Sequence, residues 1–568
     1  MATRAKNKTT VKSKKTKASV KKTKSARTSK TTKSINAPKR KAVKEKKVVK
    51  PAKAKTDKKK SVSVKRSTAK KSSVKKTVVK AAKKVVRRKK PLNIAFMASE
   101  AIPFVKTGGL ADVMGSLPLA LKEMGHNVVV FIPEYLSIHE GNFNLQDTGV
   151  RFSCPVGSNW LDVSLSKYEY NGLDFYFVKY PPYFMRSGIY GENGDYEDNL
   201  ERFTLFSKAC IEGLVRIGFR PDIIHANDWH TGLVPVFLKA FYAQSSFFEN
   251  TKTVFSIHNI AYQGVFGVDK FHLLGLDWSY FSHQALEFYG KINLLKAGIV
   301  FSDKITTVSP QFAKEIQTPD FGYGLDGVLR NRKDDLCGIL NGIDQSEWDP
   351  WNDEYIIEKF GIMSGKAYTK GKALCKADLC KECSFDSAEA PIIGMVSRLS
   401  EQKGIDLFLD TLNGIMQSLS VNIVILGTGD HYYEQALMGI APSFSGRLKA
   451  VIRFDNVLAH KIYAGADLFL MPSRYEPCGL SQMIAMRYGA IPIVRACGGL
   501  KDTVKEDIGF LFSEYSPKEL KSAVEKAVNL YYNGKKGFND RRKKAMAQDF
   551  SWASSAKEYD RLYRVALK

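Results

Sequence analysis

The chain has 568 residues, with 88 Lys and Arg, 57 Asp and Glu, and eight cysteines. The positive excess lies in residues 1–90, which hold 38 basic side chains, two acids and no aromatic residue, whereas the rest holds 50 basic and 55 acidic side chains. No uncharged apolar run approaches the roughly 20 residues that cross a bilayer, and scattered cysteines without an export signal favour reduced thiols, which argues against a membrane protein and a secreted protein.

Residues 1–90 are too charged and too poor in large apolar side chains to form a core, so we predict a disordered basic tail. Its Lys-Lys and Ala-Lys-Lys blocks resemble the tails of linker-histone-like proteins. Such a tail would bind polyanions, nucleic acid foremost, by releasing counterions. The alternatives are a solubilising or tethering segment and a plastid transit peptide.

From Pro91 on, short apolar runs alternate with helical patterns. The first run, 92–99, leads through the glycine-rich turn 106–109 into a helix that begins near Leu110 and ends at Gly125. Repeated strand and helix units predict a parallel sheet with helices on both faces. The further strands expected are 128–132, 175–178, 221–225, 254–258 and 305–308, and helices are expected at 201–217 and 231–242.

The alternation restarts at Pro391 with the runs IIGMVS, VNIVILG, LKAVIRF, DLFLMP and AIPIVRA. The predicted fold is therefore α/β, with two doubly wound Rossmann-like lobes at 91–340 and 391–545 and a crossover region at 341–390. Sheets of this kind bind ligands at the carboxyl ends of their strands, so we expect a ligand between the lobes.

The strongest ligand signal is the stretch 467–503, in which two strand-to-helix corners lie side by side. Its polar loop carries Glu476, and its two predicted helices begin after Gly479 and Gly499. Free N–H groups and a positive dipole at a helix N-terminus suit phosphate or sugar hydroxyls. The alternative is a surface loop with a solvated Glu476.

Basic side chains follow the first predicted strand of each lobe. Arg398 ends such a strand and Lys403 precedes a helix, which predicts a diphosphate site. Lys106 lies in a turn with two glycines that matches neither dinucleotide-binding nor P-loop motifs. Asp112 follows in the first helical turn, where the dipole alone would favour an acid.

Two polar clusters, 225–230 and 258–264, directly follow apolar strands and hold too many polar groups to be core. A metal bound by His225, His230 and His258 is one alternative for these clusters. Separately, the cysteines of the run KALCKADLCKEC suggest a zinc site, although that run has no fourth ligand nearby and has a helical pattern. The three cysteines concerned are Cys375, Cys380 and Cys383.

Six motifs together resemble the bacterial and plastidial glycogen and starch synthases, and the similarity covers residues 91–568 in order. They are KTGGLADV at 106–113, HANDWH at 225–230, HNIAYQG at 258–264, LNGID at 340–344, VSRLSEQKG at 396–404 and EPCGLSQMIAMRYG at 476–489. The resemblance implies the two-lobed GT-B fold and a helix at 546–568 that packs back toward the first lobe. It also implies transfer of glucose from ADP-glucose to the non-reducing 4-OH of an α-1,4-glucan, with retention and without metal or cofactor.

The same resemblance assigns roles to particular residues. It implies that Arg398 and Lys403 hold the diphosphate, that Asp228, His258 and Asn341 line the glucose site, and that Glu476 binds sugar hydroxyls. The catalytic residues so predicted are Glu476, Asp228, His258, Arg398 and Lys403. The substrate-binding residues so predicted are Lys106, Gly108, Gly109, Asp112, Asn341, Cys478, Gly479, Leu480, Gly498 and Gly499.

The chain departs from the family pattern in several places. Asn227 replaces the usual His, and the basic tail lies outside the pattern altogether. Ile484 occupies the position where the wider superfamily often has a second Glu, which rules out a two-glutamate mechanism. We expect a cytoplasmic enzyme, or a plastidial one if the tail is a transit peptide. The alternative function is a polyanion-binding protein whose synthase-like body is kept for glucan or nucleotide binding.

Overall fold

The computed structural model describes residues 90–192, 194–362 and 366–568, and all of them belong to one compact unit. The predicted basic tail at 1–90 lies outside the described residues, except for Lys90. Within the described part of the chain, no helix is long and apolar enough to cross a membrane.

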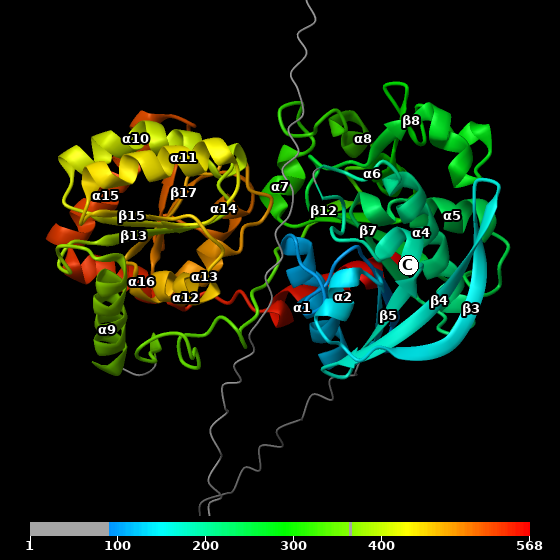
Figure 1. The fold of residues 1–568 in the computed structure, drawn as a ribbon, viewed down its shortest axis with the longest axis horizontal. Coiled ribbons are helices and arrows are strands. Elements are labelled where there is room, and N and C mark those ends of the chain that lie inside the picture. Colours follow the sequence, from blue (N-terminus) through cyan, green and yellow to red (C-terminus); the bar gives the residue numbers. More distant parts are fainter. Residues whose placement is uncertain (1–89, 193, 363–365) are drawn as a thin grey trace, which may run out of the picture. The chain divides into compact units, whose positions relative to one another are not determined.

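The first half of the described chain is built on a nine-stranded sheet of order β12-β11-β7-β6-β1-β2-β5-β4-β3 (Figure 1). The seven strands from β12 to β5 run parallel, as their continuous apolar sequences predict. Their bounds are β1 Asn93–Met97, β2 Asn127–Pro133, β5 Leu173–Lys179, β6 Ile223–Asn227, β7 Lys252–Ile257, β11 Lys304–Thr307 and β12 Leu336–Gly338.

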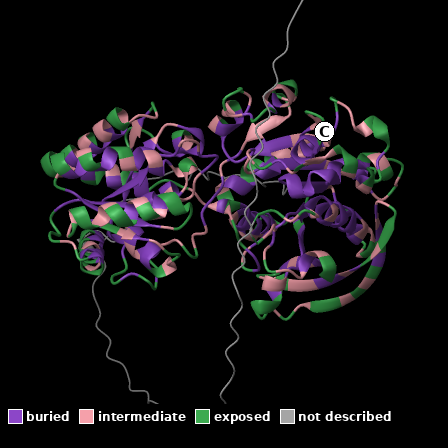
Figure 2. Ribbon diagram, turned by 45° about the horizontal axis from the view of Figure 1, so that its top comes forward, coloured by how far each residue is buried: buried purple, intermediate pink, exposed green. Residues whose placement is uncertain are grey.

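The edge of this sheet is a long antiparallel hairpin, β3 (Gln146–Val156) and β4 (Asn159–Tyr170), which the sequence analysis did not predict. Its residues alternate between buried and exposed, so the hairpin contains no continuous apolar run. Figure 2 shows the exposed residues along its outer face. Half-buried strands of this kind are found by alternation rather than by apolar runs.

Helices cover the first sheet and join its strands. Helix α1 packs against α17, and α5 packs against both α4 and α6. In α17, the Tyr563 hydroxyl hydrogen-bonds Nδ1 of the buried His225 over 2.8 Å, and Arg564 donates to the Lys90 carbonyl over 3.1 Å. The helices are α1 Gly109–Glu123, α4 Asn199–Arg216, α5 Leu233–Phe241, α6 Leu294–Phe301 and α17 Trp552–Ala566.

The second half holds a six-stranded, fully parallel sheet of order β15-β14-β13-β16-β17-β18. Successive side chains of β13 point to opposite faces of the sheet. Ile393 belongs to the apolar cluster that includes α10 and α15, whereas Ile392 belongs to the cluster that includes α12 and α13. The predicted α/β class with two Rossmann-like lobes is confirmed. The elements are β13 Ile392–Val396, β14 Asn422–Leu426, β15 Leu448–Val451, β16 Leu468–Met471, β17 Ile491–Arg495, β18 Phe510–Phe512, α10 Ile405–Ser418, α12 Asn456–Gly465, α13 Ser481–Arg487 and α15 Pro517–Asn533.

The crossover region between the two halves packs against the second half. Trp348 stacks on His460 with ring centroids 4.1 Å apart, and the buried Asp353 carboxylate lies 2.7 Å from His460 Nδ1 and accepts from the Tyr488 hydroxyl over 2.6 Å. Helix α9 (Lys366–Cys383) follows and packs on α12. Its three cysteines are buried free thiols, and no group of three or more potential metal ligands occurs among the described residues.

Candidate active site

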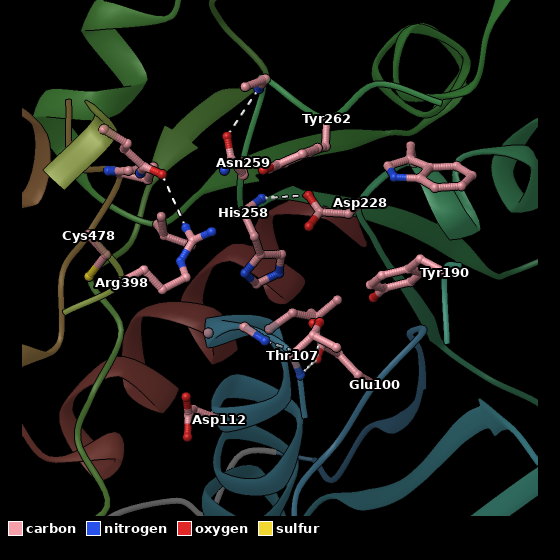
Figure 3. Close-up of a pocket in the computed structure, with 18 of the residues that line it drawn as sticks. Glu100, Thr107, Asp112, Tyr190, Asp228, His258, Asn259, Tyr262, Arg398 and Cys478 are labelled. Carbon is pink, nitrogen blue, oxygen red and sulfur yellow. Dashed lines mark hydrogen bonds between the residues drawn. The ribbon is translucent and has the colours of Figure 1, made fainter. Parts of the chain in front are cut away.

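A cavity of about 1070 Å³ is lined by residues that follow strands of both sheets. Figure 3 shows Glu100, Asp228 and His258 from the first half and Arg398 and Cys478 from the second around this space. Except for Gly498 and Gly499, every site residue predicted from the sequence lines the cavity. These residues are Lys106, Gly108, Gly109, Asp112, Asp228, His258, Asn341, Arg398, Lys403, Glu476, Cys478, Gly479 and Leu480.

Glu476 and Lys403 form an ion pair in the wall of this cavity. Lys403 Nζ lies 2.7 Å from Glu476 Oε2, and the Ser473 hydroxyl donates to the same oxygen over 3.1 Å. Glu476 is only 4% exposed, so it is not a solvated loop residue. The neighbouring Gly404 has a φ of 73°, and a Cβ there would lie 2.1 Å from the Pro472 carbonyl oxygen. This close approach of the two loops brings Lys403 beside Glu476.

Arg398 is the exposed cation of the second half in this cavity. It follows β13, and Nη2 donates to Gln402 Oε1 over 3.2 Å, a single hydrogen bond to a neutral group. The guanidinium extends into the space between the two halves (Figure 3). Since Arg398 has no carboxylate partner among the described residues, it is available for an anionic ligand.

Glu100, which the sequence analysis missed, organises the turn before α1. Its carboxylate follows β1 and accepts from the backbone N–H and hydroxyl of Thr107 and from the N–H of Gly108. Burial raises the pKa of Glu100 above its ordinary value. Lys106 in the same turn pairs with Asp112 over 2.7 Å. Asp112 is therefore more than an acid that stabilises the helix dipole.

Asp228 is held in an unusual backbone conformation at the end of β6. Its φ of 54° lies in the left-handed region, which non-glycine residues adopt at a cost. Its carboxylate accepts from the His258 backbone N–H over 2.7 Å, and burial raises the pKa of Asp228 to about 7. Desolvation lowers the pKa of His258 to about 4, so this imidazole is neutral near pH 7.

Asn227, which stands where the family pattern has His, forms hydrogen bonds with both of its side-chain polar atoms. Its amide nitrogen donates to the carbonyls of Met97 and His225, each over 3.1 Å. Its Oδ1 then faces Nε2 of His258 at 2.9 Å. An amide oxygen only accepts, so the proton of the neutral His258 lies on Nε2. Asn227 thereby orients a residue of the cavity wall.

The three histidines proposed as a metal site do not converge. His225 is fully buried between the Tyr563 hydroxyl at 2.8 Å and the Ser256 hydroxyl at 2.6 Å, while His230 stacks on Tyr190 with centroids 4.6 Å apart. His230 and His258 line the cavity, and His225 does not. The predicted alternative of a metal bound by these three histidines is therefore wrong, because their side chains contact different groups and do not meet at one point.

Gly498 and Gly499 do not line the cavity. They begin α14 (Gly498–Thr503), whose first N–H groups already have partners. The Gly498 N–H donates to the Glu315 carboxylate oxygens at 2.9 and 3.1 Å, and the Gly499 N–H donates to the Glu476 carbonyl at 3.0 Å. Glu315 ends α7 (Pro310–Glu315), so the first half supplies the anion at this helix end.

Aromatic residues that line the cavity come largely from loops. Tyr262 is 60% exposed and Tyr323 is 44% exposed, and the hydroxyl of the partly buried Tyr190 lies 2.7 Å from Ser99 Oγ. Tyr262 lies within a cluster that the sequence analysis singled out. Tyr190 and Tyr323 belong to irregular segments, where no periodicity signals a site.

Two doubly wound sheets whose strand ends share one cavity, with cations on both sides of it, form the architecture of the GT-B glycosyltransferases, and the matching family models assign the chain to that class. The chain matches the family model for the starch synthase catalytic domain over residues 93–331 and that for glycosyl transferases group 1 over residues 384–545. It belongs to the glycogen and starch synthase family.

Relatives and solved structures agree with this assignment. The glycogen synthase of Koribacter versatilis is 44% identical over 491 residues, which are 84% of this chain and 98% of that protein. The glycogen synthase of Thermodesulfovibrio yellowstonii is 43% identical, over 83% of this chain and 97% of that protein. The catalytic domain of starch synthase IV from Arabidopsis thaliana, solved with ADP and acarbose, is similar with a TM-score of 0.76 and 31% identity, over 84% of this chain and all of that one.

Proposed function

We propose that the protein transfers glucose from ADP-glucose to the non-reducing 4-OH of an α-1,4-glucan, with retention at the anomeric carbon. The observation that carries this proposal is the placement of Lys106, Arg398 and Lys403 along one cavity, together with Glu476. Membership of a family of glucosyltransferases and the ADP in the similar starch synthase structure support the donor. The bacterial relatives, which are glycogen synthases, support a glycogen-type acceptor.

The cations would act on the diphosphate of the donor. Arg398 offers a planar set of donors that suits phosphate oxygens, and Lys403 and Lys106 each add a positive charge. Charge develops on the leaving phosphate as the bond to glucose breaks, so cations fixed beside it lower the barrier. As Lys403 turns toward phosphate, the Glu476 carboxylate loses its ion pair and becomes free to accept hydrogen bonds from the sugar.

The first half would supply the contacts to the transferred glucose. Asp228 and His258 lie in the wall and are joined by the hydrogen bond from the His258 N–H, and the buried Asn341 Oδ1 has no hydrogen-bond partner in the part of the chain that the structure describes. An unpaired buried oxygen favours a ligand hydroxyl there, because buried polar groups are normally paired. Each of these groups would help to orient the sugar for attack.

Retention of configuration permits two routes. A double displacement needs a carboxylate nucleophile beneath the anomeric carbon, for which Asp228 is the nearest candidate by motif. We favour reaction on one face, in which the leaving phosphate takes the proton of the incoming hydroxyl. A carboxylate with a pKa of about 7 that already accepts the His258 N–H is poorly prepared as a nucleophile. Exclusion of water from the cavity would then favour transfer over hydrolysis.

The test is ADP release by the full chain with ADP-glucose and glycogen, with UDP-glucose run in parallel. We expect glucan-dependent ADP release that falls about 10² to 10³-fold in Lys403→Ala, the loss typical of removing one such donor. Lys449→Ala, an exposed lysine on β15, is the matched control and should keep full activity. No release with either nucleotide sugar, or equal activity of both variants, would overturn the proposal.

A further inference from the structure

A second cavity lies at the other end of the strands of the second sheet. Its wall includes Asp467, which directly precedes β16, whereas Glu476 of the active site follows that strand. The cavity has a volume of about 270 Å³ and is lined by residues of α9, α15 and α16 (Lys535–Met546). In Figure 1, α9 and α16 lie on the side of the sheet that also carries α12 and α13.

The wall of this cavity carries a surplus of positive charge. Lys372, Lys376, Lys535 and Arg542 line it, with Asp467 as the lining carboxylate. Lys376 Nζ lies 2.9 Å from Asp467 Oδ2, and Arg542 Nη2 lies 2.7 Å from Asp467 Oδ1, so this one carboxylate already serves two cations. Buried cations without a counter-charge cost free energy, so the cluster is incomplete as it stands.

Lys372 is the buried cation of this cluster that binds no carboxylate among the described residues. It is only 4% exposed and donates to the carbonyls of Tyr488 over 2.9 Å and Tyr463 over 3.3 Å. Burial, with a smaller contribution from the Arg542 charge, lowers the pKa of Lys372 to about 7. An anion beside it would restore the charged form.

Two further polar atoms of the wall are unsatisfied. The Arg542 guanidinium lies beside the Tyr368 hydroxyl, and among the described residues neither that hydroxyl oxygen nor Arg542 Nε has a hydrogen-bond partner of normal geometry. Tyr368 is 2% exposed and Arg542 is 8% exposed, so water outside the protein scarcely reaches them. Both atoms can donate, which suits a ligand made of acceptor oxygens.

The start of α16 adds to the positive field. Helix α16 has 12 residues, its Gly534 N-cap offers no side-chain hydrogen bond, and its first turn holds no acid. The first N–H groups therefore keep their partial positive charge, and Lys535 at the first position adds a full one. The side chains at 535, 538, 539 and 542 then place one face of the helix along the cavity.

We propose that this cavity binds a small phosphate-bearing anion, either inorganic phosphate or the phosphate group of a phosphorylated metabolite. A phosphate brings a charge of about −1.5 to −2 and several acceptor oxygens, which match the surplus cations and the two unsatisfied donors. The volume lies just below the range of about 300 to 1,000 Å³ typical of small-molecule sites, so the ligand is small. The bound anion would tie the crossover helix α9 to α16.

The test is calorimetric titration of the full chain with orthophosphate, a hexose phosphate and the unphosphorylated hexose. Lys535→Glu changes an exposed residue whose side chain has no partner among the described residues, so the fold should survive. Lys536→Glu is the matched control, because it makes the same charge change in the same helical turn but does not line the cavity. We expect phosphate binding that weakens at least tenfold in Lys535→Glu and less than about threefold in Lys536→Glu.

A third variant, Arg398→Ala, distinguishes phosphate binding in the first cavity from binding in the second. Phosphate binding that persists in Arg398→Ala and is lost in Lys535→Glu supports the second site. Binding that disappears in Arg398→Ala and is unchanged in Lys535→Glu overturns it, and so does the absence of any phosphate binding. Tighter binding of the hexose phosphate than of orthophosphate would identify a metabolite as the ligand, whereas equal affinities would identify phosphate itself.

Discussion

Asp228 carries a stability penalty that its replacement by Asn should remove. The side chain is 8% exposed, and burial raises its pKa from 3.8 to about 7 in the folded protein. Asn has nearly the same shape and still offers an oxygen to the His258 N–H. Asp228→Asn therefore changes the ionisation and leaves the packing and the hydrogen bond in place.

The sign and the size of the effect follow from linkage. Because the folded pKa is the higher one, the unfolded chain loses this proton first, and the folded state loses stability as pH rises from about 4 to about 7. A shift of about three pKa units corresponds to roughly 4 kcal/mol at 1.36 kcal/mol per unit, as an upper limit. The Asn variant should therefore match the wild type near pH 4 and exceed its stability above pH 7.

Urea denaturation of both proteins at pH 4.5 and pH 8.0 measures this difference. Asp410→Asn, at an exposed position of α10, controls for the general loss of an acid. If Asp228 acts on the sugar as we propose, glucosyl transfer should fall about 10²-fold or more while stability rises. A stability difference that is the same at both pH values would refute the reasoning about the buried carboxyl.

Three further changes test the site and the fold. Arg398→Ala should lower kcat/KM about 10² to 10³-fold in the ADP-release assay, and near-normal activity would remove Arg398 from the diphosphate site. Glu476→Gln should lose transfer while its circular dichroism spectrum stays native; a fully active variant would contradict its role in binding the sugar. Tyr563→Phe leaves Nδ1 of the buried His225 without its partner, so chemical denaturation should show a loss of about 1 to 3 kcal/mol, and an unchanged midpoint would argue against this hydrogen bond.

Much of the fold could be read from local sequence. Parallel strands are buried on both faces, so they appear as continuous apolar runs, and those of β1, β2, β6, β13 and β16 were found close to their observed bounds. The β3 and β4 hairpin was missed because each strand buries only one face and the apolar residues alternate with polar ones. No continuous apolar run in the sequence identifies β3 or β4 as a strand.

Most residues of the candidate active site could be predicted from the sequence, but the contacts between their side chains could not. Arg398, Lys403 and Lys106 follow predicted strands, and parallel sheets place such positions at one edge. The ion pair between Lys403 and Glu476 joins residues 73 positions apart, and the hydrogen bond from His258 to Asn227 joins neighbouring strands. Local patterns carry no information about which side chains meet across such distances.

The sequence alone determined the α/β class, the two lobes and the chemical character of the residues at their strand ends, because periodicity and motif spacing are local properties. Only the tertiary structure decided that Glu315 occupies the start of α14, that Glu100 holds the Lys106 turn, and that a second cationic cavity surrounds Asp467. These features depend on which elements pack together, and packing is the outcome of many weak contacts between distant parts of the chain.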